Sequence, residues 1–143
     1  MPSDVEVRLV ERPGADLRTL RAAVHAVAGE HLGVLGRLCP HCAATTHGRP
    51  RAPGVHVSLA YAPGLAVLAS SPTTPLGVDV ERSDVAPPPP FTPSSWTAVE
   101  AVLKLTGEGL RRDPATVRPH DEARLLPLDL PPGFTGWLAL PQR

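Results

Sequence analysis

Several features are absent from this sequence of 143 residues, and each absence argues against a class of protein. No apolar run approaches the ~20 residues that a membrane span needs, so we expect no membrane contact. The first residues show no charged-then-apolar signal pattern, and we therefore expect a cytoplasmic protein. The formal net charge is zero, which argues against nucleic acid as a partner. The length suits one compact unit.

Lysine is nearly absent: Lys104 stands alone beside thirteen arginines. Together with nineteen prolines and abundant alanine, this indicates a GC-rich coding bias, under which arginine replaces lysine wherever any cation serves. The lysine ammonium is a compact point charge that suits phosphate, whereas the arginine guanidinium is a planar fork. Lys104 is therefore a candidate for a position that needs an ammonium.

The pattern of apolar residues predicts a mixture of helices and short strands. Helical spacing over 15–31 and 96–106 predicts two helices, ended by Gly33 and Gly107 respectively. The region 37–54 is rich in Cys, His, Pro and Gly and is expected to be a loop. The expected strands cover 4–10, 55–60, 65–70, 76–81, 124–128 and 134–140, the last two forming a hairpin.

The strand predicted over 76–81 carries two carboxylates on one face. Side chains alternate along a strand, so Val78 and Val80 point one way and Asp79 and Glu81 the other. Carboxylates side by side repel one another, and a divalent cation with a preference for oxygen, such as Mg²⁺, removes that cost. The alternative is the solvated outer face of an edge strand.

The second predicted helix places Trp96, Glu100 and Lys104 four residues apart, in one stripe. Taken alone, a Glu–Lys pair at this spacing is most often a surface ion pair worth ~0.3–0.5 kcal/mol, and the tryptophan is most often a core residue. The stripe gains meaning only together with the carboxylate strand that precedes it.

These two blocks, GVDVE at 77–81 and WTAVEAVLKLTGEGL at 96–110, resemble the motifs of the 4′-phosphopantetheinyl transferase superfamily. Val99 departs from the pattern, because the family has a lysine there. The resemblance implies a shortened, pseudo-dimeric member of the synthetase-activating type. Its fold would be α+β, with two pseudo-related lobes, each a helix packed on a short antiparallel sheet. Here the lobes would be 1–75, for the nucleotide end of coenzyme A, and 76–143, for the metal and phosphate.

The resemblance extends upstream more loosely. The family's Arg-Thr-Leu and Gly-basic-Pro elements correspond to Arg18-Thr19-Leu20 and Gly48-Arg49-Pro50, and both imply contacts to coenzyme A. Where the family has a Ser-His strand end that holds the 3′-phosphate, this chain reads VSLAY over 57–61. Ser58 and Tyr61 remain as candidate contacts, and the phenol can still donate one hydrogen bond.

The implied reaction moves 4′-phosphopantetheine from coenzyme A to a serine of an acyl or peptidyl carrier protein. The resemblance implies Mg²⁺ on Asp79, Glu81 and Glu100, with Lys104 as a charge against the phosphate. Glu100 or a metal-bound water would deprotonate the serine. Both halves lie in one chain, so we expect a monomer.

An alternative within the same fold is a degenerate protein that binds but does not catalyse. Only the proline-rich stretch 82–95 joins the two motifs, where the family usually places helices that receive the carrier. The discriminating observation is whether the purified protein loads coenzyme A onto a carrier in the presence of Mg²⁺.

A third class, a zinc-stapled interaction domain, rests on Cys39, Cys42 and His47. Two thiolates and one or two imidazoles can make a tetrahedral zinc site. A second C-x2-C pair is absent, however, so reduced thiols are the favoured state.

Overall fold

The computed structural model describes residues 2–33, 35–38 and 49–143. The motif of Cys39, Cys42 and His47 lies outside these residues. The described helices are α1 (Leu17–Leu32), α2 (Pro93–Thr106) and the short α3 (Pro119–Glu122), with 3₁₀ turns at Gly109–Arg111 and Pro114–Thr116. The described strands are β1 (Glu6–Glu11), β2 (Gly36–Leu38), β3 (Arg49–Arg51), β4 (His56–Ala62), β5 (Leu65–Ser71), β6 (Gly77–Arg82), β7 (Arg124–Pro127) and β8 (Phe134–Leu140).

Six of these strands form two antiparallel sheets of three, in the orders β1-β5-β4 and β6-β8-β7. Apart from β2 and β3, which form a separate pair, each half runs strand, long helix, strand, strand along the chain. In each sheet the first strand pairs with the third, which pairs with the second. The two halves therefore share connectivity and strand order, and the α+β class expected from the sequence is confirmed.

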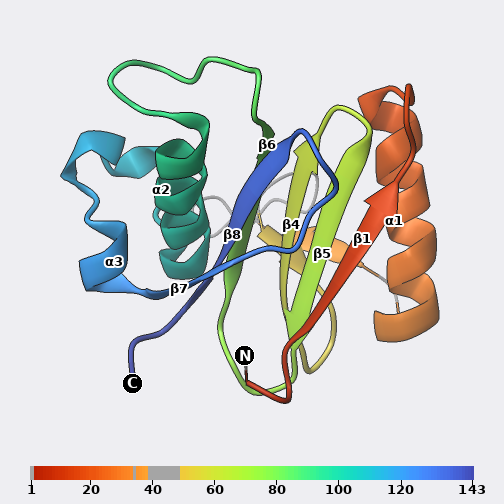
Figure 1. The fold of residues 1–143 in the computed structure, drawn as a ribbon. Helices are drawn as coiled ribbons and strands as arrows, with labels where there is room; N and C mark the ends of the chain where they lie inside the picture. Colours follow the sequence, from red (N-terminus) through yellow and green to blue (C-terminus); the bar gives the residue numbers. More distant parts are fainter. Residues whose placement is uncertain (1, 34, 39–48) are drawn as a thin grey trace.

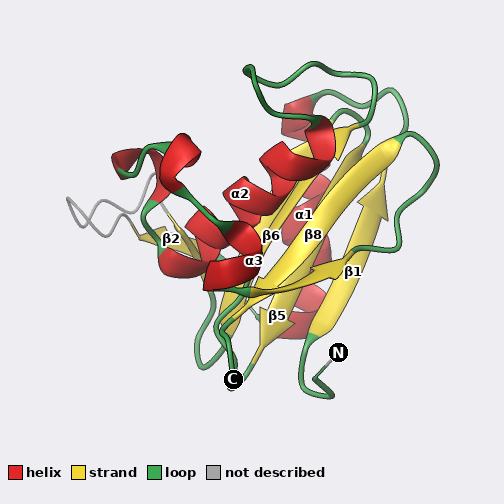
Figure 2. Ribbon diagram, turned by 60° about the vertical axis from the view of Figure 1, so that its left-hand side comes forward, coloured by secondary structure: helices red, strands yellow, loops and turns green. Residues whose placement is uncertain are grey.

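The two long helices lie at opposite ends of the molecule, each against its own sheet (Figure 1). The sheet faces that carry neither helix join in one apolar cluster, which includes Leu65 and Val67 of β5, Val78 and Val80 of β6, and Leu138 of β8. Strand β4 lies beside β6 where the two sheets meet. The halves thus share a core and pack as one unit (Figure 2).

The ends of the long helices follow from local chemistry. Asp16 caps α1 through the backbone N–H of Thr19, and the chain leaves the helix at Gly33 with φ of 80°. Thr92 and Ser95 form a capping box at the start of α2, so this helix begins a turn earlier than the sequence pattern indicates. Its end at Gly107, with φ of 79°, is as predicted.

One pairing was not expected. Within the region predicted as a loop, β2 and β3 form a short antiparallel ladder that joins Arg37 to Pro50. Each strand has only three residues and contains or adjoins glycine or proline, so no alternating pattern marks it in the sequence. The ladder matters because it carries Arg49 toward α2. Within the described residues, no helix is both long and apolar enough to cross a membrane.

Candidate functional site

Strand β6 presents the carboxylate of Asp79 to α2. Val78 and Val80 are buried in the shared core. Asp79 points the other way and meets Lys104 of α2, with 3.0 Å between its Oδ1 and the lysine Nζ. The alternative of a solvated outer face is wrong for Asp79, whose side chain is only 15% exposed.

Gly77 explains how the helix comes so close to the strand. A Cβ atom built there would lie 2.2 Å from the carbonyl oxygen of Ala101 and 2.5 Å from the backbone nitrogen of Leu105. Only a glycine allows this approach, because both obstacles are backbone atoms of α2. The glycine of the GVDVE motif therefore sets the distance between Asp79 and the last turns of the helix.

Lys104 connects the two halves of the molecule. Its Nζ donates to Asp79 in the second half and, at 2.9 Å, to the backbone carbonyl of Leu59 on β4 in the first half. Leu59 was not a predicted site residue, because a backbone oxygen leaves no mark in the sequence. The reading of Lys104 as a mere surface partner of Glu100 is wrong, since it is only 33% exposed and pairs with Asp79.

Burial and mutual repulsion act on the carboxylates of the site. Burial raises the pKa of Asp79, the charge of Lys104 opposes that rise, and the charge of Glu81 adds to it. Burial likewise raises the pKa of the half-buried Glu100, as does the charge of Asp79, whereas Lys104 lowers it. Glu100 is thus a carboxylate with an increased affinity for a proton.

The resemblance implies Mg²⁺ here, and the donors can be tested against that ion. Asp79, Glu81 and Glu100 offer only oxygen ligands, which suit Mg²⁺. The influence of Glu81 on Asp79, and of Asp79 on Glu100, shows that they share one electrostatic environment. Among the described residues, however, no three His, Cys, Asp or Glu side chains are grouped to hold a metal. These oxygen ligands suit Mg²⁺. In the present arrangement, however, one oxygen of Asp79 accepts a hydrogen bond from Lys104.

Arg49 reaches the same region from β3. Its Nη2 lies 3.0 Å from the backbone carbonyl oxygen of Lys104, in the last turn of α2, and its Nη1 lies close to Gly107. A cation at a helix C-terminus satisfies carbonyls left without partners and is favoured by the helix dipole. Pro50 follows on the strand and lines a neighbouring pocket with Arg49.

Two further predicted contacts have structural roles. Ser58 is buried, and its Oγ accepts a hydrogen bond of 3.0 Å from the backbone N–H of Val78, which ties β4 to β6. Tyr61 packs on the α1 side of the first sheet, with the guanidinium of Arg21 5.7 Å from the centre of its ring. Its buried hydroxyl has no hydrogen-bond partner among the described residues, and burial raises its pKa.

Arg18 and Thr19 are not brought to the Asp79–Lys104 cluster. Both are exposed in the first turn of α1, and the backbone N–H of Thr19 donates to the capping side chain of Asp16. Both three-stranded sheets lie between α1 and α2 (Figure 1). Of the predicted residues, Asp79, Glu100, Lys104 and Arg49 therefore gather around α2, while the Arg-Thr-Leu element stands apart.

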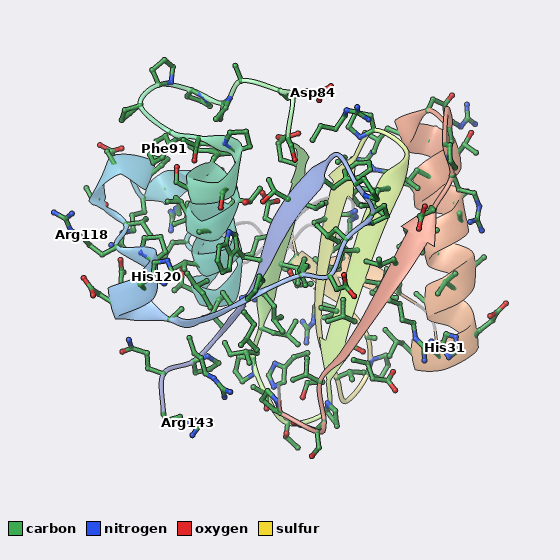
Figure 3. The ribbon with its side chains drawn as sticks, viewed as in Figure 1. His31, Asp84, Phe91, Arg118, His120 and Arg143 are labelled. Carbon is green, nitrogen blue, oxygen red and sulfur yellow. The ribbon has the colours of Figure 1, made fainter. Side chains whose placement is uncertain are left out.

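Aromatic residues surround the start of α2. The ring centres of Phe91 and Trp96 are 5.0 Å apart, and Figure 3 places Phe91 beside the first turn of the helix. Trp137 of β8 donates from Nε1 to the carbonyl oxygen of Ser94 at 3.0 Å. Trp96 is only half-buried, so the head of the predicted stripe lies at the edge of the core.

A pocket of about 570 Å³ lies at the junction of β3 and β4, lined by most of 49–57 together with Pro72 and Leu76. Arg51 and His56 line it and were missed in the sequence. The pattern Arg-Pro-Arg contained a signal, because residues two apart in a strand point to the same side, but the segment was expected to be a loop.

Comparison with known proteins adds no evidence on the function of this site. No protein-family model matches the chain, and the search of curated proteins finds no match either.

Proposed function

We propose that the chain is a 4′-phosphopantetheinyl transferase that uses Mg²⁺ and moves phosphopantetheine from coenzyme A to a serine of an acyl or peptidyl carrier protein. One observation carries the proposal. The ammonium of Lys104 is held where the two halves meet, by Asp79 and the carbonyl of Leu59, with Glu100 one turn away on the same helix.

The fold supports the proposal. The resemblance implies two pseudo-related lobes, each with a helix on a short antiparallel sheet. The two halves of this chain share connectivity and strand order, and each carries one long helix on its sheet. Both halves belong to one chain, which is why we propose a monomer.

Lys104 is suited to hold a phosphate. An ammonium has three N–H donors, and two of them are directed at Asp79 and Leu59. The third is left for a phosphate oxygen of coenzyme A. Because Asp79 and Leu59 fix the ammonium from both halves, it is positioned before the substrate arrives, which lowers the cost of orienting it.

Glu100 is the proposed general base. Its raised pKa increases its affinity for the proton of the carrier serine. The serine oxygen attacks the phosphorus next to the pantetheine arm, and its proton passes to Glu100. The bond to adenosine 3′,5′-bisphosphate breaks, and this group leaves. Mg²⁺, held by Asp79, Glu81 and Glu100, would supply positive charge against the phosphate oxygens.

A second candidate is the degenerate protein that binds coenzyme A or a carrier without transferring the arm. Three observations favour it. Lys104 occupies an oxygen of Asp79, Ser58 is used in joining β4 to β6, and the 83–92 segment between β6 and α2 contains no helix.

A transfer assay separates the two candidates. The purified protein is incubated with coenzyme A, Mg²⁺ and a panel of acyl and peptidyl carrier proteins, and the mass of each carrier is measured. We expect a carrier to gain the phosphopantetheine mass with the wild type, and Asp79→Asn and Glu100→Gln each to abolish the gain. Glu30→Gln, an exposed carboxylate on α1, is the matched control and should retain activity. Binding of coenzyme A without any mass gain would favour the degenerate protein.

A further inference from the structure

Two carboxylates of strand β6 are already bonded to donors of the protein itself. Asp79 accepts a hydrogen bond of 3.0 Å through Oδ1 from the ammonium of Lys104. Glu81 accepts one of 3.1 Å through Oε1 from the backbone N–H of Arg82. Among the described residues, no three side chains of the kinds that bind metals are grouped to hold an ion. The carboxylates are therefore arranged around internal donors, of which Lys104 is the charged one.

The charge of Lys104 opposes a second cation at Asp79. The ammonium lies 3.0 Å from the carboxylate oxygen, and the side chain of Asp79 is only 15% exposed. The same ammonium acts on Glu100, because burial and the charge of Asp79 raise the pKa of that carboxyl and Lys104 lowers it. Two cations at one carboxylate repel each other, and this repulsion is screened less where the groups are partly buried. The ion pair therefore weakens the binding of Mg²⁺ for as long as it lasts.

The two hydrogen bonds of the ammonium differ in how readily they can be exchanged. The carbonyl of Leu59, at 2.9 Å, belongs to the backbone of β4, which its pairing with β5 holds in place. The oxygen of Asp79 belongs to a side chain and is replaceable as an acceptor. A phosphate oxygen is charged and accepts strong hydrogen bonds from an ammonium. It can therefore take the place of the Asp79 oxygen while Lys104 keeps its bond to Leu59.

We propose that Lys104 is an internal counter-ion of Asp79, which keeps the affinity for Mg²⁺ low until coenzyme A binds. A phosphate of coenzyme A then takes over the ammonium, and Asp79 is released as a ligand for the metal. The inference rests on the proposed function and deepens it, because it makes Lys104 the residue that couples the binding of metal and substrate. Such coupling is reciprocal: each partner raises the affinity for the other by the same factor.

Calorimetric titration with Mg²⁺ alone tests the counter-ion directly. We expect Lys104→Met to bind Mg²⁺ more tightly than the wild type by about tenfold or more, since a unit charge beside a partly buried carboxylate is removed. Lys104→Gln keeps an N–H donor for Asp79 without the charge, should also gain affinity, and covers the case in which Lys104→Met does not fold. In Asp79→Asn/Lys104→Met the gain should be lost. Arg12→Gln, an exposed arginine in the β1–α1 turn, is the matched control and should bind Mg²⁺ like the wild type.

A second titration with Mg²⁺, in the presence of saturating coenzyme A, tests the release of Asp79. The affinity of the wild type for Mg²⁺ should rise by about tenfold or more, because the phosphate then holds the ammonium. The rise should be smaller in Lys104→Met, where Asp79 has no ammonium to give up. If coenzyme A leaves the affinity of the wild type unchanged, or raises that of Lys104→Met as much, the release step is overturned.

The outcomes distinguish the counter-ion from the reaction. If neither Lys104→Met nor Lys104→Gln binds Mg²⁺ more tightly than the wild type, the counter-ion is overturned, even where the wild type loads a carrier. It is also overturned if Arg12→Gln gains as much affinity, because the effect is then one of net charge. The same holds if Asp79→Asn/Lys104→Met keeps the gain, because the ion then binds elsewhere. If both titrations behave as expected but the wild type loads no carrier, the transferase proposal fails and the counter-ion stands.

Discussion

The two halves of the molecule have the same connectivity and strand order but use the contact between helix and sheet differently. In the first half, α1 buries Leu20, Val24 and Ala28 against an apolar sheet face. In the second, α2 also packs on an apolar face, but its last turns meet the carboxylate of Asp79 through Lys104. The contact between helix and sheet is thus apolar packing in the first half, whereas in the second half it also holds a charged cluster.

Connectivity alone does not make the charged cluster, which depends on a few residues at one contact between strand and helix. Gly77 brings the backbones of β6 and α2 together, and Asp79 and Lys104 then find each other in a partly buried place. On α1 the glycine is Gly29, and a Cβ atom there would meet nothing within 4 Å. Substitutions in the two halves can therefore test whether this close approach is what sets the second half apart.

The largest effect is expected from Gly77→Ala. The added methyl group would meet two backbone atoms of α2, which cannot move aside as a flexible side chain does. We expect a loss of about 3 kcal/mol in the free energy of unfolding, at the upper end for overpacking. Gly29→Ala in α1 should instead stabilise the protein by about 0.5–1 kcal/mol, because alanine favours a helix where space is open. Chemical denaturation of both variants measures this, and equal effects would show that the β6–α2 approach is not special.

Lys104→Met should cost about 1–3 kcal/mol, because it leaves the carboxylate of Asp79 buried without its partner. The cost depends on pH. The pKa of Asp79 is raised in the folded state and rises further without Lys104. Such a group disfavours folding as pH rises, so the deficit is smallest below 3.8, the ordinary value for aspartate, and grows as pH increases through the folded-state pKa.

Unfolding curves between acid and neutral pH test this sign. The double variant Asp79→Asn/Lys104→Met should recover much of the loss at neutral pH, since no buried charge remains. A deficit that is constant with pH, or that is greatest in acid, would show that Lys104 stabilises the protein through packing alone.

Lys104→Arg tests the ammonium itself. In a sequence with thirteen arginines, a position that accepts any cation would be expected to carry arginine. The guanidinium is a larger, planar fork than the compact ammonium and would displace the donor that faces the phosphate, and a displacement of about an ångström there can cost ~100-fold. We expect carrier loading to fall by more than tenfold while the melting temperature changes little. Unchanged turnover would show that Lys104 has a structural role and that the reaction does not need an ammonium there.

The sequence predicted the second half better than the first for a physical reason. Asp79 and Lys104 lie on elements with clear periodicity, so their faces follow from alternation and from helical spacing. Arg51 lies on a three-residue strand that contains proline, where neither pattern can develop, and His56 begins β4, an expected strand in which no motif marks it. The carbonyl of Leu59 and the bond from Ser58 to Val78 depend on how two sheets meet, which no local pattern encodes.

The smallest effect compares two arginines at opposite helix ends. Arg49 binds the carbonyl of Lys104 in the last turn of α2, where the helix dipole favours a cation, whereas Arg18 lies in the first turn of α1, where the dipole disfavours one. Without ligand, Arg49→Gln should therefore destabilise the protein by about 0.5–1 kcal/mol, and Arg18→Gln should be neutral or stabilise it by about 0.3 kcal/mol. Denaturation at low and high salt measures both, and the difference should shrink as salt screens the dipole. A loss with Arg49→Gln that does not change with salt would indicate that the hydrogen bond to Lys104, rather than the dipole, holds β3 against α2.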